Sequence, residues 1–222
     1  MFFGHHPEMN DTKGNTKNIG RTTQNTNNCV SMGTQNLTST KQKYNVAIGY
    51  QNQHGTTLGL GSLIFNQYNI LFGNQNQYTI QSAANGQVQN NILFGYQNQY
   101  TIQSSANGQV LNNTCIGYRN QFNIVNSTNK TTNNNISMGY QSLYSVKSNS
   151  KNCTDNITIG FQNIFLKTGQ YPLTDSANNI AIGGNAMSAL TTGTRNLAIG
   201  VQAYDDSDTE NDNIAIGYQA MT

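Results

Sequence analysis

The residues of this sequence best suited to chemistry are the carboxylates of one acidic run. Five of the nine acidic residues lie between Asp205 and Asp212, in the segment DDSDTEND. Oxygen ligands at alternate positions of a turn can surround a hard cation such as Ca²⁺. The run therefore predicts a candidate calcium site made of Asp206, Asp208, Glu210 and Asp212. The glycine and the distal glutamate of an EF-hand loop are missing, and a solvated polar turn between two repeats is the alternative.

Aromatic side chains form the second candidate site. A tyrosine follows the repeated glycine in many copies of the sequence motif described below, and tyrosine rings beside Gln and Asn amides suit carbohydrate recognition. The glycan-binding candidates are Tyr50, Tyr96, Tyr118, Tyr140 and Tyr218. The alternative is that these rings stack on one another and stabilise the fold or a contact between chains.

Other groups that could act in catalysis are sparse. A glycosidase needs two carboxylates facing each other across the scissile bond, and outside the acidic run the repeats contain only Asp155 and Asp175. The three histidines and three cysteines have no spacing typical of catalysis or of a metal site. Cys115 stands where other copies have a small residue, which indicates a buried structural thiol. We therefore predict a protein that is not an enzyme and has no cofactor apart from the candidate Ca²⁺.

These residues belong to a repeat with the pattern Asn, aliphatic, small, aliphatic, Gly, aromatic, Gln, as in NILFGYQ at Asn91 and NIAIGYQ at Asn213. A period in this range is typical of a solenoid. We expect an all-β chain, a parallel β-roll or β-solenoid whose short coils have roughly 12 to 23 residues, each with two brief strands and two turns. The motif glycines that set these spacings are Gly33, Gly49, Gly61, Gly73, Gly95, Gly117, Gly139, Gly160, Gly183, Gly200 and Gly217.

Strand alternation assigns the motif residues to two faces. The residues one and three before each glycine are large and apolar, and we predict that they fill the coil interior. The small residue between them, such as Ala47 or Ala181, is expected to pack against another copy of the chain. The motif asparagines are expected to hydrogen-bond from coil to coil. The predicted core is Ile48, Phe72, Phe94, Ile116, Met138, Ile159, Ile182, Ile199 and Ile216.

The last three copies, NNIAIGGNAM, RNLAIGVQAY and DNIAIGYQAM, resemble the head repeats of trimeric autotransporter adhesins, which also occur in fibre proteins of phages and large viruses. The resemblance extends from Cys29 to the C-terminus. It implies a parallel β-roll in which three chains pack side by side as a homotrimer. The function expected from it is that of a structural fibre on a virion, with contact to host receptors or glycans. The alternative is the head domain of a cell-surface adhesin.

Composition limits the remaining choices. Only 9% of residues are charged and the net charge is +2, which is too little to attract nucleic acid. No apolar run is long enough to cross a membrane. We expect residues 1–27 to form an N-terminal arm or attachment segment and residues 28–222 to form the repeat domain. Expected partners are further copies of the chain, including end-to-end stacking, and a fibre or capsid protein. Several asparagines begin N-glycosylation sequons: Asn126, Asn129, Asn135 and Asn156.

Overall fold

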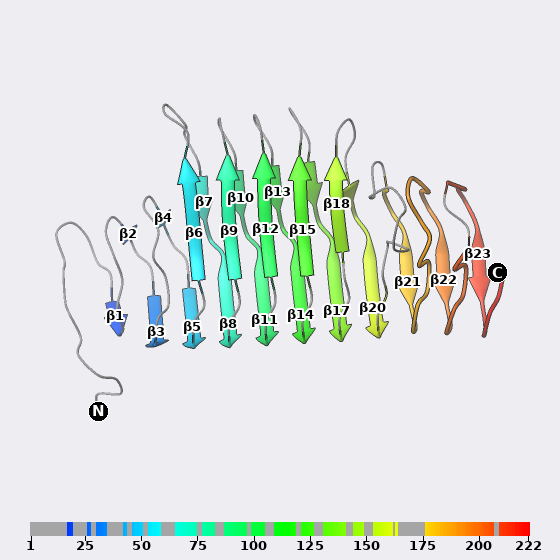
Figure 1. Ribbon diagram of the computed structural model, residues 1–222, viewed down its shortest axis with the longest axis horizontal. Helices are drawn as coiled ribbons and strands as arrows, with labels where there is room; N and C mark the ends of the chain where they lie inside the picture. Colours follow the sequence, from blue (N-terminus) through cyan, green and yellow to red (C-terminus); the bar gives the residue numbers. More distant parts are fainter. Residues whose placement is uncertain are drawn as a thin grey trace.

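The chain folds as a stack of coils, a parallel β-solenoid whose strands form three sheets along the stack (Figure 1). The predicted all-β solenoid class is confirmed. The described part of the chain contains no α-helix, and so no helix that could cross a membrane. The computed structural model describes residues 17–19, 26–27, 30–34, 42–43, 46–50, 53–58, 65–74, 77–82, 87–96, 99–104, 109–118, 121–126, 131–140, 144–148, 153–161, 163, 176–206 and 209–222.

The repeated motif forms the largest sheet, which we call the motif sheet. Each motif supplies one strand, and glycines pair in register with glycines where the strands include them, for example Gly95 with Gly117. The strands are β1 (Lys17–Ile19), β3 (Val30–Thr34), β5 (Val46–Tyr50), β8 (Ile70–Asn74), β11 (Ile92–Tyr96), β14 (Thr114–Tyr118), β17 (Ile136–Tyr140), β20 (Ile157–Phe161), β21 (Ile180–Ile182), β22 (Leu197–Ile199) and β23 (Ile214–Ile216).

Two smaller sheets complete the longer coils. A seven-stranded sheet contains β2 (Thr26–Asn27), β4 (Gln42–Lys43), β7 (Phe65–Gln67), β10 (Gln87–Gln89), β13 (Gln109–Leu111), β16 (Thr131–Asn133) and β19 (Cys153–Thr154). A five-stranded sheet contains β6 (Gln53–Leu58), β9 (Gln77–Ser82), β12 (Gln99–Ser104), β15 (Gln121–Asn126) and β18 (Tyr144–Ser148). The longer coils therefore have three strands, and the expectation of two brief strands and two turns was wrong for them.

The coil lengths also differ from the expected range. Strand β5 pairs directly with β8, so Gly49 lies beside Gly73. One coil, longer than any that the motif glycines predicted, therefore replaces the two short coils expected around Gly61. Gly61 itself lies outside the described residues. The shortest coil between described strands joins β1 to β3, where Lys17 pairs with Val30.

The motif sheet begins inside the segment expected to be an arm. Strand β1 pairs with β3, and β2 pairs with β4, so residues 17–19 and 26–27 already belong to the stack. The predicted boundary between residues 27 and 28 therefore does not separate the repeat from a different kind of structure. Residues 1–16, with His5 and His6, lie outside the described residues.

The predicted core was wrong, because the two faces of the motif strand are exchanged. None of the nine predicted core residues is buried: Ile48, Phe72, Ile116, Met138 and Ile182 are half-buried, and Phe94, Ile159, Ile199 and Ile216 are exposed. The small or apolar residues between them, which were expected to meet another chain, fill the interior instead, each at most 5% exposed. They are Ala47, Leu71, Leu93, Cys115, Ser137, Thr158, Ala181, Ala198 and Ala215.

The exchange has a steric cause. Alternation places the two sets on opposite faces but does not say which face is inside. In the C-terminal coils the interior also receives Met187, Leu190 and Tyr204 from the turns opposite the motif sheet, and all three are buried. In these coils alanine fits into the space that remains, and the larger aliphatic residues lie on the outside.

The motif asparagines form a buried ladder, as expected. The Oδ1 atom of each but the last accepts a hydrogen bond, 2.9–3.1 Å long, from the backbone N–H of the asparagine in the next coil. In most coils the next side-chain Nδ2 donates to the same oxygen. Buried polar groups must be satisfied in this way. The ladder asparagines are Asn69, Asn91, Asn113, Asn135, Asn156, Asn179, Asn196 and Asn213.

The residue before each ladder asparagine turns the corner of the coil. These residues have φ between 57° and 63°, the left-handed region, which asparagine and aspartate tolerate better than other residues with a Cβ. Six of the eight are Asn or Asp, which explains the frequent Asn-Asn and Asp-Asn pairs in the sequence. They are Tyr68, Asn90, Asn112, Asn134, Asp155, Asn178, Arg195 and Asp212, of which the last also belongs to the acidic run.

Candidate functional site

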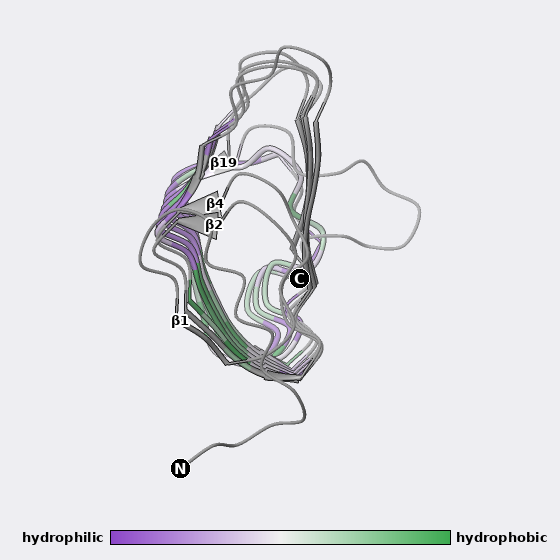
Figure 2. Cartoon of the chain, turned by 90° about the vertical axis from the view of Figure 1, so that its left-hand side faces the viewer, coloured by the Kyte–Doolittle hydropathy of each residue, from purple (hydrophilic) through white to green (hydrophobic). Residues whose placement is uncertain are grey.

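The outer face of the motif sheet is an exposed apolar surface that runs along the stack, which we call the aliphatic stripe. It consists of the residues one and three before each motif glycine on β5 to β23. Register pairing aligns them into two columns, so that Ile92 lies beside Thr114 and Phe94 beside Ile116. Exposed fractions of 38% for Phe94, 36% for Ile136 and 37% for Ile159 show that large side chains reach solvent in the middle of the rod. Hydrophobic colouring follows the strands of the motif sheet in Figure 2.

An aromatic column runs along the C-terminal ends of four strands of the same sheet. Tyr96, Tyr118, Tyr140 and Phe161 stack in sequence, with ring centroids 5.0–5.3 Å apart and ring planes within 10° of parallel. Their spacing follows the distance between adjacent strands of a sheet. The alternative interpretation, stacking along the rod, is therefore confirmed for these four rings.

The remaining glycan-binding candidates do not join this column. Asn74 pairs with Tyr96 in register and separates it from Tyr50, whose side chain lies outside the described residues. Tyr218 is highly exposed, at 71%, and lies in the last coil, apart from the column. Because sugars pack on ring faces, and the neighbouring rings cover most ring faces of the column, glycan binding there would have to use ring edges and hydroxyl groups. Glycan binding stays a prediction.

The acidic run is partly engaged by neighbouring coils. The Asp212 carboxylate accepts two hydrogen bonds from the Arg195 guanidinium, at 2.5 Å and 2.7 Å. The Asn211 side chain accepts bonds from the backbone N–H and hydroxyl of Thr194. Among the described residues no three potential ligands gather as a metal site, and Asp208 lies outside them.

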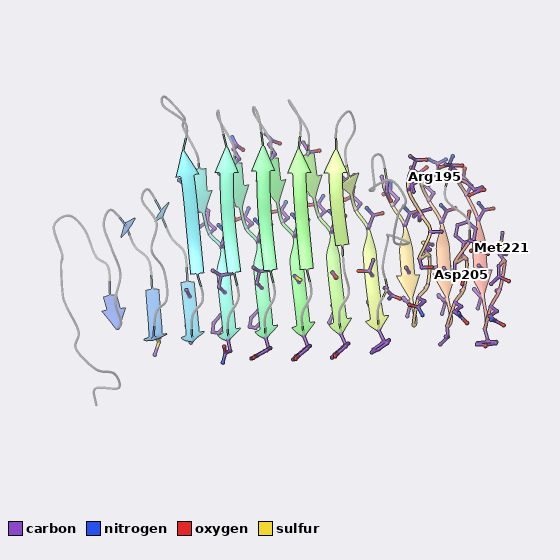
Figure 3. All side chains as sticks on the ribbon, viewed as in Figure 1. Arg195, Asp205 and Met221 are labelled. Carbon is purple, nitrogen blue, oxygen red and sulfur yellow. The ribbon has the colours of Figure 1, made fainter. Side chains whose placement is uncertain are left out.

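The first residue of the run lies apart from the ion pair. Figure 3 shows Arg195 on the upper turns of the C-terminal coils and Asp205 lower on the same coils. The backbone carbonyl of Asp205 accepts a hydrogen bond from the Ser188 hydroxyl. The Oδ1 atom of the Asp205 side chain is buried and has no hydrogen-bond partner. Asp206 and Glu210 are exposed, and the Glu210 carboxylate accepts the backbone N–H of Thr209. Calcium binding stays a prediction.

The ion pair predicts how stability responds to acid. The hydrogen bond from Arg195 is the main cause that lowers the pKa of Asp212. The ion pair therefore contributes fully to the free energy of unfolding at pH values above the pKa of Asp212 in the unfolded chain, about 4. It is lost as the pH falls through the lower folded pKa. We expect the wild type to melt above the Asp212→Asn variant at pH 7, by a small margin because both side chains are solvent-exposed. The margin should disappear at the acid end of a thermal melting series, and a constant margin would contradict this.

Burial makes the thiol of Cys115 unreactive. Its thiol is in the coil interior, and burial raises its pKa to about 12. The thiol therefore stays protonated at physiological pH and is a poor nucleophile or metal ligand. The prediction of a buried structural thiol at this position is confirmed.

Comparison with known proteins adds no identification. No family model, curated protein or solved structure matches the chain. The assignment of function therefore depends on the geometry of the rod. Its main candidate surface is the aliphatic stripe, whose outward orientation the repeat pattern did not reveal. The pattern did show a large apolar residue on both sides of most inward-facing ones, an alternation that separates the two faces but does not orient them.

Proposed function

We propose that this chain is a structural fibre protein, a β-solenoid rod that associates side by side into a homotrimer and forms part of a fibre on a virion. The observation that carries the proposal is the exposed aliphatic stripe. Exposed apolar surfaces of this extent usually mark a contact with another protein. The rod has its own buried interior, so the stripe is not needed to complete the core of a single chain.

A second copy of the same chain is the partner that fits the stripe. The partner must present apolar groups over the same length and with the same strand-to-strand spacing. An identical rod in parallel orientation does so, coil by coil. Packing three copies around one axis follows the resemblance of the motif to trimeric adhesin heads. The contact face then consists of the large aliphatic residues, rather than the small residues that the sequence first indicated.

We also propose that the exposed aromatic residues, above all Tyr218, contact a host receptor or glycan. A cell-surface adhesin head, the alternative setting, would use the same rod and differ in its anchor. Neither setting requires catalysis. The oligomeric contact is common to both, so it is tested first.

The test is absolute mass in solution, measured by light scattering over a concentration series. We expect the wild type at three times the 24.3 kDa of one chain. We expect the Ile159→Lys variant at the mass of one chain, because three lysines without partners would meet in the contact. Circular dichroism would show that this variant keeps its strands.

The matched control is Thr209→Lys, which adds the same charge at an exposed turn outside the stripe and should leave the mass unchanged. A wild type that remains a single chain at every concentration would rule out the homotrimer. So would an Ile159→Lys variant that assembles as well as the wild type.

A further inference from the structure

Two asparagines of the buried ladder are also the acceptor positions of N-glycosylation sequons. The interior residue of each motif lies two positions after the ladder asparagine. Where it is Ser137 or Thr158, the motif reads Asn135-Ile136-Ser137 or Asn156-Ile157-Thr158, the sequence that oligosaccharide transferases recognise. In other coils, such as those with Leu93 or Ala181, the interior residue is apolar and these sequons are absent.

In the folded chain, neither acceptor nitrogen has a hydrogen free for reaction. Asn135 is 3% exposed, and its Nδ2 donates to Asn113 Oδ1 and to the Asn133 carbonyl, both at 3.0 Å. Asn156 is 1% exposed, and its Nδ2 donates to Asn135 Oδ1 and to the carbonyls of Thr154 and Ser176. These bonds use both hydrogens of each amide.

We propose that Asn135 and Asn156 accept N-linked glycan only while the chain is unfolded, and that this modification and folding exclude each other. Transfer forms a bond between Nδ2 and C1 of the oligosaccharide and breaks the C1–O bond to the lipid diphosphate donor, which leaves. One Nδ2 proton is released. The modified amide retains one hydrogen for its two or more acceptors and carries a sugar into the coil interior. The ladder cannot close around it.

A third sequon shows the contrast within the same fold. Asn112-Asn113-Thr114 places its acceptor at the exposed corner of the coil, where Asn112 Nδ2 makes one hydrogen bond, to Asn134 Oδ1. A glycan there would extend into solvent. The three sites differ in burial rather than in sequence, so folding alone should decide which of them can be modified.

Glycosylation at the two buried asparagines restricts where the chain can fold. Productive folding requires a compartment without lipid-linked oligosaccharide and its transferase, or folding that is complete before the transferase acts. This requirement does not depend on the proposed fibre function or on the oligomeric state.

The experiment is translation of the full chain, behind a cleavable signal sequence, into microsomes that contain the transferase and its lipid-linked donor. Protease treatment separates folded from unfolded protein, and mass spectrometry identifies the glycosylated asparagines in each pool. We expect glycan at Asn135 and Asn156 only in the protease-sensitive pool. A synthetic peptide of residues 133–140 should accept glycan at Asn135.

The rescue variant is Ser137→Ala combined with Thr158→Val. Ser137 Oγ is buried without a partner, and Thr158 Oγ1 makes one long bond of 3.4 Å, so removing both hydroxyls should spare the fold. We expect this variant to increase the protease-resistant fraction in microsomes and to match the wild type when made without them. Asn112→Gly, which removes the exposed acceptor and keeps the left-handed backbone, is the control and should not increase it.

Two results would overturn the proposal. One is glycan at Asn135 or Asn156 in protease-resistant protein. The other is the absence of glycan at these asparagines from both pools and from the peptide.

Discussion

The Gly183→Ala variant is expected to lose about 4 kcal/mol or more of its free energy of unfolding, from backbone strain and overpacking combined. Gly183 has φ of +143°, which residues with a Cβ rarely adopt. A Cβ there would lie 2.2 Å from the carbonyl oxygen of Gly200 and 2.6 Å from its carbonyl carbon. Both are backbone atoms of the next coil and cannot rotate away.

Two neighbouring glycines provide the controls. Gly217→Ala has the same kind of backbone strain, with φ of +126°, but its Cβ would meet no atom within 4 Å, so it should lose only about 1–3 kcal/mol. Gly184→Ala would make ordinary contacts, the nearest at 3.7 Å, and should stay within about 1 kcal/mol of the wild type. Urea denaturation followed by circular dichroism gives all three values. Equal losses for Gly183→Ala and Gly217→Ala would show that coil-to-coil contact is not what requires glycine.

The Asn113→Ala variant is expected to lose about 3–5 kcal/mol, because truncation leaves several buried polar groups without partners. Asn113 Oδ1 accepts the backbone N–H and the side-chain Nδ2 of Asn135, and its own Nδ2 donates to Asn91 Oδ1 and the Leu111 carbonyl. The change therefore interrupts the ladder on both sides. Urea denaturation again gives the loss.

The adjacent residue is the matched control for this prediction. Asn112→Gly removes a side chain that also bonds to the coils on either side, but at the solvent-exposed corner, and glycine keeps the left-handed backbone. We expect a loss within about 1 kcal/mol for this variant. Similar losses for Asn112→Gly and Asn113→Ala would mean that burial does not determine the contribution of a ladder amide.

The sequence predicted the parts of the fold that depend on repetition. The recurring Asn and Gly positions gave the solenoid class, the glycine register and the coil-to-coil asparagine bonds. The third sheet was missed, although its sequence alternates visibly: in QYTIQS at Gln99, the apolar or aromatic Tyr100 and Ile102 alternate with the polar Thr101 and Gln103. The Asn-Gly pair later in the same coil is typical of a tight turn and competes with this alternation as a signal.

The inner and outer faces could not be assigned from the motif alone. Period-two alternation is symmetric, and burial of large apolar residues is a general tendency that fails on the C-terminal strands, where Ala198 is buried and Ile199 exposed. The deciding information lies elsewhere in the coil, where Met187 and Tyr204 from the turns are buried together with Ala181 and Ala198. The candidate sites were harder to predict than the faces of the strand. Pairing of side chains such as Arg195 and Asp212 depends on how turns 17 residues apart align.

The asparagine ladder gives the rod a direction. Each Oδ1 accepts from the asparagine of the coil that follows it in the chain, so a finished coil presents an acceptor to the coil made next. Protein synthesis delivers coils in that same order, from the N-terminus onward. The chain can therefore fold vectorially, each coil templating its successor as it leaves the ribosome, with no need to wait for the distant end of the polypeptide.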